Sequence, residues 1–210
     1  RYIYALDQYT GALQWRYKLG GMVYSSSPSV SGGMVFVGSD DNYIYALDQY
    51  TGALQWRYKT GSYVDSSPSV SGGMVFIGSN DKYIYALDQY TGALQWRYKL
   101  GGMVYSSSPS VSGGMVFVGS DDNYIYALDQ YTGALQWRYK TGSYVDSSPS
   151  VSGGMVFIGS NDKYIYALDQ YTGALQWRYE TGGGVRSSPS VSGGMVFVGS
   201  SDNYIYALGD

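Results

Sequence analysis

The sequence YIYALDQYTGALQW at residues 43–56 is the repeating unit on which the structure of this chain is based. It recurs along all 210 residues with little change, and its tryptophan returns at intervals of 40 or 41 residues. A period of about 40 residues is typical of repeat architectures, in which one unit buries its apolar surface only against its neighbours. The repeated tryptophans are Trp15, Trp56, Trp96, Trp137 and Trp177. We therefore expect residues 1–210 to form a single domain of five repeats.

Short runs of apolar or alternating residues, separated by Gly, Ser, Asp and Asn, predict four strands in each repeat. In the repeat that follows Trp15 these runs are residues 26–31, 34–37, 43–47 and 53–59. Two glycines separate the first two runs and predict a hairpin turn, because glycine adopts positive φ without steric cost. No window shows the 3.6-residue period of an amphipathic helix. The chain is therefore predicted to be all-β.

The composition of each run indicates its place in the sheet. Residues 34–37 are apolar at every position, which indicates burial on both faces. Residues 26–31 are Ser, Pro and Val, whose small side chains suit a crowded position near an axis. The fourth run alternates Leu54, Trp56 and Tyr58 with polar residues, as an outer edge strand does. These features predict a β-propeller of five four-stranded antiparallel blades, closed by pairing the N- and C-terminal segments.

The pattern Ala-x-Asp-x-x-Thr-Gly-x-x-x-Trp, which runs from Ala46 to Trp56, resembles the tryptophan-docking motif of quinoprotein-type (PQQ-like) β-propellers. Val-Phe-Val-Gly-Ser at residues 35–39 resembles the second strand of the same repeats. The resemblance extends over the whole chain in five copies. It implies that each tryptophan packs on a neighbouring blade. The structural docking residues expected beside the five tryptophans are the motif glycines Gly11, Gly52, Gly92, Gly133 and Gly173.

Quinoprotein enzymes with this fold bind PQQ and calcium at one end of a larger ring. This chain has no cysteine pair and no single-copy set of Glu, Asn and Asp for calcium. It also has no histidine, which excludes Ser–His and Cys–His nucleophilic pairs and His-ligated zinc or haem. Paired carboxylates of glycosidase type need unlike environments, whereas a repeat gives its carboxylates like environments. We therefore expect no catalytic, cofactor-binding or metal-binding residues, with a PQQ- and calcium-dependent enzyme as the alternative.

Charge and hydropathy narrow the set of partners. The net charge is −3 and there is no basic stripe, so binding to nucleic acid is not expected. No apolar run approaches the roughly 20 residues of a membrane-spanning helix. The sequence itself leaves the compartment undecided, while the family resemblance implies a periplasmic or extracellular location.

Two features of the repeats concern origin and assembly. Residues 2–82 and 83–163 are identical position for position, which indicates recent amplification or deliberate engineering. The sequence YIYAL occurs six times, so the copies at residues 2–6 and 204–208 compete for one place in a five-bladed ring. We expect the first copy to fill that place, because it keeps the docking motif after it. Exchange of the spare strand between chains, giving a structural self-associating propeller, is the alternative.

Differences between the repeats indicate where a ligand would bind. Two segments of each repeat vary, namely the link between blades and the turn between the second and third strands. Outside them, Glu180 replaces the Lys of the other repeats. In a four-stranded antiparallel blade both segments emerge at the same end, and their Asp and Asn residues are first of all turn formers. We expect a non-enzymatic scaffold or binding module that recognises an unidentified protein or small ligand on this face. The candidate binding residues are Tyr24, Asp65, Tyr105, Asp146 and Arg186.

Overall fold

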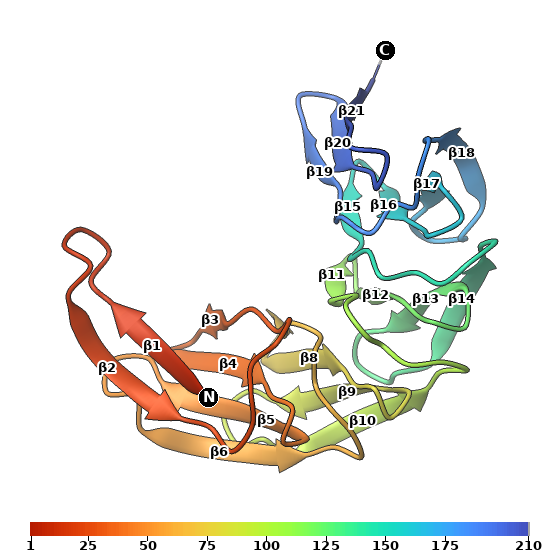
Figure 1. The fold of residues 1–210 in the computed structure, drawn as a ribbon. Coiled ribbons are helices and arrows are strands. Elements are labelled where there is room, and N and C mark those ends of the chain that lie inside the picture. Colours follow the sequence, from red (N-terminus) through yellow and green to blue (C-terminus); the bar gives the residue numbers. More distant parts are fainter. Residues whose placement is uncertain (210) are drawn as a thin grey trace.

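The computed structural model describes residues 1–209, and in these residues all regular structure is β-strand. The strands form four complete four-stranded antiparallel sheets, a two-stranded sheet at the N-terminal end and a three-stranded sheet at the C-terminal end. The sheets follow one another around an arc, each packed on the next (Figure 1). This confirms the all-β propeller architecture predicted from the repeat.

The innermost strand of every sheet except the two-stranded N-terminal one is the short segment Ser-Val-Ser. Backbone N–H groups just before these strands donate to serine hydroxyls of the next blade, as from Ser27 to Ser67 Oγ (2.8 Å) and from Ser67 to Ser108 Oγ (2.9 Å). Small side chains allow this close approach along the axis. The innermost strands are β3 (Ser29–Ser31), β7 (Ser69–Ser71), β11 (Ser110–Ser112), β15 (Ser150–Ser152) and β19 (Ser190–Ser192).

The second strand lies at the centre of its sheet and is buried on both faces in the complete blades. Phe36, Phe76 and Phe117 are fully buried, as expected for the uninterrupted apolar run. The hydrophobic clusters of the core span adjacent blades at this level. The second strands are β4 (Met34–Gly38), β8 (Met74–Gly78), β12 (Met115–Gly119), β16 (Met155–Gly159) and β20 (Met195–Gly199).

The third strand carries the Tyr-Ile-Tyr-Ala-Leu sequence. Its register places a small residue beside the large core side chain, with Ala46 opposite Phe36. The third strands of the complete blades are β5 (Tyr43–Asp48), β9 (Tyr83–Asp88), β13 (Tyr124–Asp129) and β17 (Tyr164–Asp169). The two remaining copies are β1 (Tyr2–Leu6) and β21 (Ile205–Leu208).

The outer strand differs from the simple alternation predicted for it. Trp56 is buried and the Arg57 guanidinium lies over the Tyr43 ring (4.7 Å), but Leu54 is exposed rather than packed. The cause is a β-bulge opposite Ala46 and Leu47, which shifts the register before the tryptophan. The outer strands are β2 (Leu13–Lys18), β6 (Leu54–Lys59), β10 (Leu94–Lys99), β14 (Leu135–Lys140) and β18 (Leu175–Glu180).

Adjacent blades are joined by a tryptophan whose indole lies against the turn of the next blade. Trp56 Nε1 donates to the Gln89 carbonyl (2.9 Å), and a Cβ built on Gly92 would lie 2.6 Å from the same ring. Glycine is required there both by this contact and by its φ of +70°. Trp15, Trp96 and Trp137 make the same bond to Gln49, Gln130 and Gln170, each at 2.9 Å.

The turn that receives the tryptophan is held by its own aspartate. Asp88 Oδ1 accepts hydrogen bonds from the Thr91 amide (2.8 Å), the Thr91 hydroxyl (2.8 Å) and the Tyr90 amide (3.0 Å). The hydrogen bonds from Thr91 lower the pKa of Asp88. These aspartates therefore fix the turn that docks the indole, which is the structural role expected for an Asx turn.

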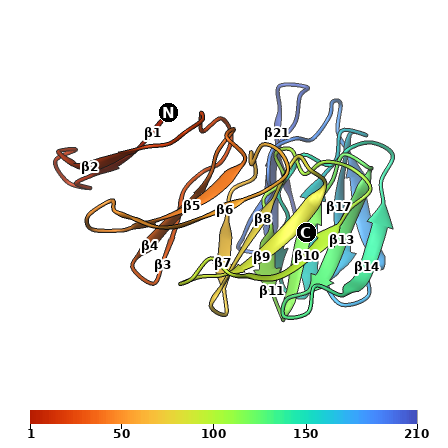
Figure 2. The same cartoon turned by 90° about the horizontal axis from the view of Figure 1, so that it is seen from below.

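The expected closure of the ring is not made within residues 1–209. Strand β1 pairs only with β2, and β21 pairs only with β20. The two incomplete sheets lie at opposite ends of an open arc, and the view turned by 90° also places β1–β2 at one extremity (Figures 1 and 2). The tryptophan contact is the same at four of the five junctions between sheets, and it gives these junctions the same rotation from blade to blade. Trp177 and Gly11, which were expected to dock in the same way, make no such contact within residues 1–209, because the turn and the indole that would meet them belong to the incomplete end sheets. Repeating this rotation along the chain leaves the two end sheets apart (Figure 1).

Glycine substitutions in two turns separate the docking contact from backbone strain. Gly92→Ala places a methyl group against Trp56, whereas Gly73→Ala has a similar φ of +76° and no atom within 4 Å of the added carbon. We expect Gly73→Ala to lower the free energy of unfolding by about 1–2 kcal/mol from φ strain alone. Gly92→Ala should cost about 1–3 kcal/mol more, from overpacking. Urea denaturation measures both, and equal losses would contradict the docking role of Gly92.

Candidate functional site

The two variable segments of each repeat are joined by a backbone hydrogen bond. The Asp40 amide donates to the Met22 carbonyl (2.9 Å), and the Asn80 amide donates to the Tyr63 carbonyl (2.9 Å). Equivalent bonds link Asp121 to Met103 and Asn161 to Tyr144. The link that enters a blade and the turn between its second and third strands therefore form one continuous surface, which we call the variable face.

The turns at the other end of the blades form a second surface of constant sequence. The Gln89 side-chain amide donates to the Ser31 carbonyl of the preceding blade (3.0 Å), and the Gln49 amide donates to the Gly33 carbonyl (2.9 Å). This surface, which we call the constant face, repeats the backbone bond from blade to blade, while the Gln130 side chain donates to the Ser71 hydroxyl instead of a carbonyl. It carries the most exposed tyrosines of the turns, Tyr9 and Tyr50.

One aspartate in each variable turn has a structural role. Asp81 Oδ2 accepts hydrogen bonds from the Tyr85 hydroxyl (2.6 Å) and from the Gly61 amide of the incoming link (2.6 Å). The same arrangement holds Gly101 and Tyr126 to Asp122. Burial, together with the bond to Asp122, raises the pKa of Tyr126 to about 12. These carboxylates are occupied by the protein itself, in agreement with the turn-forming role expected for them.

The five candidate binding residues are placed unequally on the variable face. Tyr24 and Tyr105 are exposed, Arg186 is exposed, and Asp146 is half-buried. Asp65 is buried and accepts a hydrogen bond from the Asn80 side-chain amide (2.8 Å). Burial and the neighbouring Asp40 raise the pKa of Asp65, while the bond from Asn80 opposes that rise.

Two of the candidate residues contact each other. Arg186 Nε lies 3.9 Å from Asp146 Oδ2 and donates to Asn161 Oδ1 (2.8 Å). Arg186 Nη2 donates to the Tyr144 hydroxyl (3.2 Å), and the guanidinium lies 6.0 Å from the centre of that ring. The variable face thus contains one site already filled by a cation from the next blade.

A cavity of about 470 Å³ surrounds this contact. Three of the five candidate residues line it, namely Tyr105, Asp146 and Arg186. The other two candidates, Tyr24 and Asp65, do not line it. Three further lining residues were not predicted from the comparison of the repeats. The additional lining residues are Met103, Asp121 and Tyr144. All three lie in the variable segments, so the sequence differences between repeats pointed to them as well. Those differences alone could not distinguish a binding residue from an ordinary loop residue.

Asp121 is a partly buried carboxyl of this cavity. Burial raises its pKa to about 6, and the nearby carboxylates of Asp146 and Asp122 contribute to the rise. Asp40 and Asp65 form an equivalent acidic pair in the upstream repeat. Within the described residues no group of three or more Asp, Glu, His or Cys side chains is arranged to hold a metal ion.

The architecture defines the class of protein. Four-stranded antiparallel sheets, docked by a tryptophan on the Asp-Gln-Tyr-Thr-Gly turn of the next sheet, are the blades of a PQQ-like β-propeller. The chain belongs to the family described as outer membrane protein assembly factor BamB, whose family model matches residues 1–104, 61–147 and 141–209. No curated protein matches the sequence.

Two of the solved structures that are similar to this chain illustrate the fold. BamB from Moraxella catarrhalis has a TM-score of 0.82 and 23% sequence identity, and the match covers 95% of this chain and 65% of that one. The computationally designed Ika8 protein has a TM-score of 0.85 and 19% identity, and the match covers 96% of this chain and 63% of that one. The chain therefore spans slightly less than two thirds of either structure. Within residues 1–209 no helix is long and apolar enough to cross a membrane.

The pKa of Asp121 predicts a pH effect on stability. A carboxyl whose pKa is raised in the folded state binds its proton more tightly there, so its contribution to stability falls as the pH rises from about 4 to about 6. Asp121→Asn removes this effect and introduces the residue found at the equivalent positions 80 and 161. We expect the variant to have a higher Tm than the parent near pH 7.5, by about 1–2 °C because solvent screens the carboxyl.

Asp122→Asn is the matched control for this measurement. It weakens hydrogen bonds from the Tyr126 hydroxyl (2.6 Å) and the Gly101 amide (2.8 Å), so it should lower the Tm. Thermal melts monitored by circular dichroism near pH 4.5 and pH 7.5 distinguish the two variants. A lower Tm for Asp121→Asn near pH 7.5 would contradict the unfavourable ionisation of Asp121.

Proposed function

We propose that this chain is a non-enzymatic propeller scaffold that recognises a protein partner through the variable face. One observation carries the proposal. In blades that are otherwise copies of one another, the segments that differ are hydrogen-bonded together at one end, while the turns at the other end keep their sequence. Differences confined to one surface are what a binding surface on a repeat scaffold requires, because the constant residues hold the blades and the variable ones are free to match a ligand.

The chemistry of the variable face favours a partner with a basic side chain. Acidic pairs occur in two successive repeats, at Asp40 with Asp65 and at Asp121 with Asp146. At the second pair, Arg186 already supplies a guanidinium that contacts Asp146 and Asn161. The side-chain oxygen of Asn80, the counterpart of Asn161, is buried and has no hydrogen-bond partner in the described residues. A cation near the first pair would relieve the repulsion between its carboxylates.

Exposed tyrosines supply the contact area around these charges. Tyr24 is 74% exposed and Tyr105 is 42% exposed. Tyrosine is enriched in protein interfaces because its ring is rigid and apolar while its hydroxyl finds polar partners. The face therefore combines aromatic anchors with acidic groups.

The family supports a protein as the partner. Its description names an outer membrane protein assembly factor, and the similar protein from Moraxella catarrhalis is a BamB. By this relationship we propose that the chain acts outside the cytoplasm, in the periplasm or extracellularly, and binds another protein there. The aspartates of the docking turns, such as Asp48, Asp88 and Asp129, repeat in the same hydrogen-bonded setting in each blade. This repetition favours a scaffold over an enzyme, because catalysis by paired carboxylates needs unlike environments.

Site-specific crosslinking tests which face binds. A photoreactive phenylalanine analogue at position 24 or 105 should form adducts with the partner in cells that produce the chain, because these positions lie on the variable face. The same analogue at position 50 or 131, on the constant face, is the matched control, since Tyr50 and Tyr131 are also exposed. Mass spectrometry of the adducts identifies the partner. Adducts confined to positions 50 and 131 would contradict the assignment of the face.

A charge reversal tests the proposed chemistry. Asp40→Lys places a cation beside Asp65 without removing a described hydrogen bond of the Asp40 side chain, and should reduce the yield of adducts at position 24 or 105 about tenfold. The double variant Gln55→Lys with Gln95→Lys changes the net charge by the same +2 at exposed positions near the constant-face ends of β6 and β10, and controls for the change in net charge. Unchanged adduct yield with Asp40→Lys would show that the partner does not use this acidic pair.

A further inference from the structure

The last tryptophan of the chain lacks the docking partner that the other four have. Trp15, Trp56, Trp96 and Trp137 each donate to the carbonyl of a glutamine in the following turn. Trp177 Nε1 has no hydrogen-bond partner among residues 1–209. The turn that would receive it is absent from the described C-terminal sheet, because β21 ends at Leu208.

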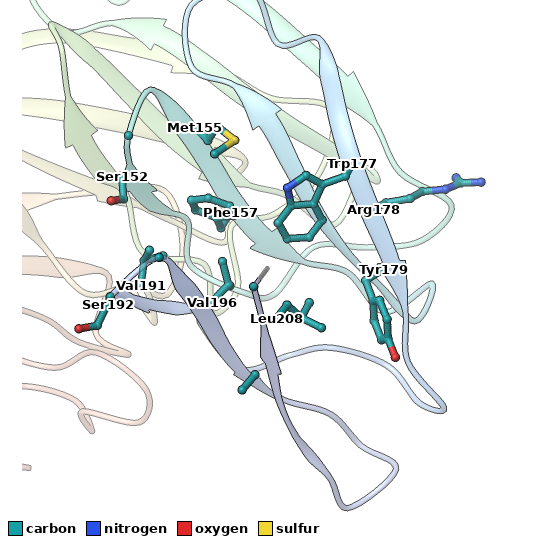
Figure 3. Close-up of a pocket in the computed structure, with 15 residues that line it drawn as sticks. Ser152, Met155, Phe157, Trp177, Arg178, Tyr179, Val191, Ser192, Val196 and Leu208 are labelled. Atoms are coloured by element: carbon teal, nitrogen blue, oxygen red, sulfur yellow. The ribbon is translucent and has the colours of Figure 1, made fainter.

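A cavity of about 700 Å³ occupies the place of that turn. Trp177, Phe157 and Val196 face the same hollow, and Leu208 lies at its border (Figure 3). Ser152 and Gly153 also line it. In the complete junctions, the counterpart of Gly153 is covered by the side chain of a glutamine, as Gly113 is by Gln170.

The opposite end of the arc carries the turn that this cavity lacks. Asp7 Oδ1 accepts hydrogen bonds from the Thr10 amide (2.8 Å) and hydroxyl (2.8 Å), so the turn is built as in the other repeats. Gly11 has a φ of +71° and no atom within 4 Å of an added Cβ, whereas its counterpart Gly52 lies against Trp15. This turn therefore has the shape that docks an indole and has no indole in the described chain.

The strands on either side of the missing contact are also complementary. In β1, Tyr4 and Leu6 are 54% and 57% exposed, while their counterparts Tyr45 and Leu47 in β5 are buried. Strand β21 spans four residues against six in β5, and it leaves Met195 without the pairing that Met34 makes with Asp48. The hairpin β1–β2 is a complete pair of third and outer strands, whereas β19–β20 is a complete pair of first and second strands.

For a chain of these 210 residues we propose that the β1–β2 hairpin docks onto β19–β20 of a second copy. Strand β1 takes the place of β21 beside β20, in the register of Gly199 with Ile3 and Met195 with Asp7. The indole N–H of Trp177 then donates to the Gln8 carbonyl, and the Gln8 side-chain amide donates to the Ser152 carbonyl. The resulting blade has the same contacts as the four complete ones. This interface is independent of the variable face.

A second copy, rather than the chain's own hairpin, is the occupant that the structure favours. Trp15 fixes β1–β2 on the next blade through its bond to Gln49 (2.9 Å), and Ile3 is buried in the same junction. The hairpin consequently lies at the far end of the arc from β20 (Figure 1). Reaching its own β20 would require a change in every intervening junction, whereas a second copy requires none. The contact is head-to-tail, so each added chain presents the same free ends.

Native mass spectrometry of the full chain tests this interface. We expect discrete integer multiples of the 23.0 kDa chain, increasing with protein concentration. Gly11→Asn should give the single-chain mass at the same concentrations, because any Cβ at this turn collides with the docked indole. Asparagine is chosen because it tolerates positive φ better than other side chains. Gly33→Asn is the matched control, because Gly33 has a φ of +78° and its counterparts are free in every junction.

A second pair of variants separates the interface from folding. Trp177→Phe removes the N–H that has no partner in the described chain, and should weaken association roughly tenfold, the effect of one hydrogen bond. Trp96→Phe instead removes a bond within the chain, so it should lower the Tm and leave association unchanged. If the parent protein has the mass of a single chain at all concentrations, the proposal is wrong. A ring closed within one chain would give this result. Multiples that persist unchanged in Gly11→Asn overturn it as well.

Discussion

The hydrogen bond from a tryptophan indole to the glutamine carbonyl of the next blade is the contact on which the rest of this structure depends. At four junctions it has the same length of 2.9 Å, and at each the indole ring lies on a glycine with positive φ. The aspartate of the turn holds its backbone through three hydrogen bonds of its own, and it does so at Asp7 as well, where no indole is docked. Blade-to-blade rotation is set by this unit, and the open arc follows from repeating it.

The same contact explains why the constant face and the variable face differ in how much their sequences can change. The docking turns and the glycine hairpins must keep their sequence, because they hold successive blades together. The links and turns at the other end contact the protein chiefly through backbone bonds and one recurrent aspartate. Their remaining side chains are consequently free to vary, and they include the acidic pairs, the exposed tyrosines and Arg186.

Much of the fold could be predicted from the sequence because equivalent residues of the five repeats occupy similar environments, so each pattern is seen several times. The continuous apolar run of β4, the small residues of β3 and the spacing of Trp56 specified the sheet order. The exposure of Leu54 could not be predicted, because it depends on a β-bulge that shifts the register before Trp56. The alternation of apolar and polar residues in the outer strand does not reveal that bulge. The open arc also escaped prediction, since counting strands says nothing about the rotation between blades.

The candidate site could be predicted only in part. Comparison of the repeats identified Asp146 and Arg186, but it did not pair them, because the two residues belong to different links. Asp121 and Tyr144 had been indistinguishable from turn formers, and only the packing of neighbouring links brings them to one cavity. Conversely, Asp65 was predicted as a binding residue because of its charge and position, but its side chain is buried and accepts a hydrogen bond from Asn80. The burial of a side chain in one of these links depends on how the neighbouring links pack against it. The sequence of one link alone therefore does not predict that burial.

Indole hydrogen exchange is the most direct test of the central contact. In the chain carrying Gly11→Asn and labelled with ¹⁵N-tryptophan, NMR follows the five Nε1–H groups separately. If docking holds the blades, four indole N–H groups are protected from exchange with D₂O and the fifth, assigned to Trp177 by its loss in Trp177→Phe, exchanges rapidly. Rapid exchange at Trp56, Trp96 or Trp137 would contradict the account, because these indoles would then not be docked on the next blade.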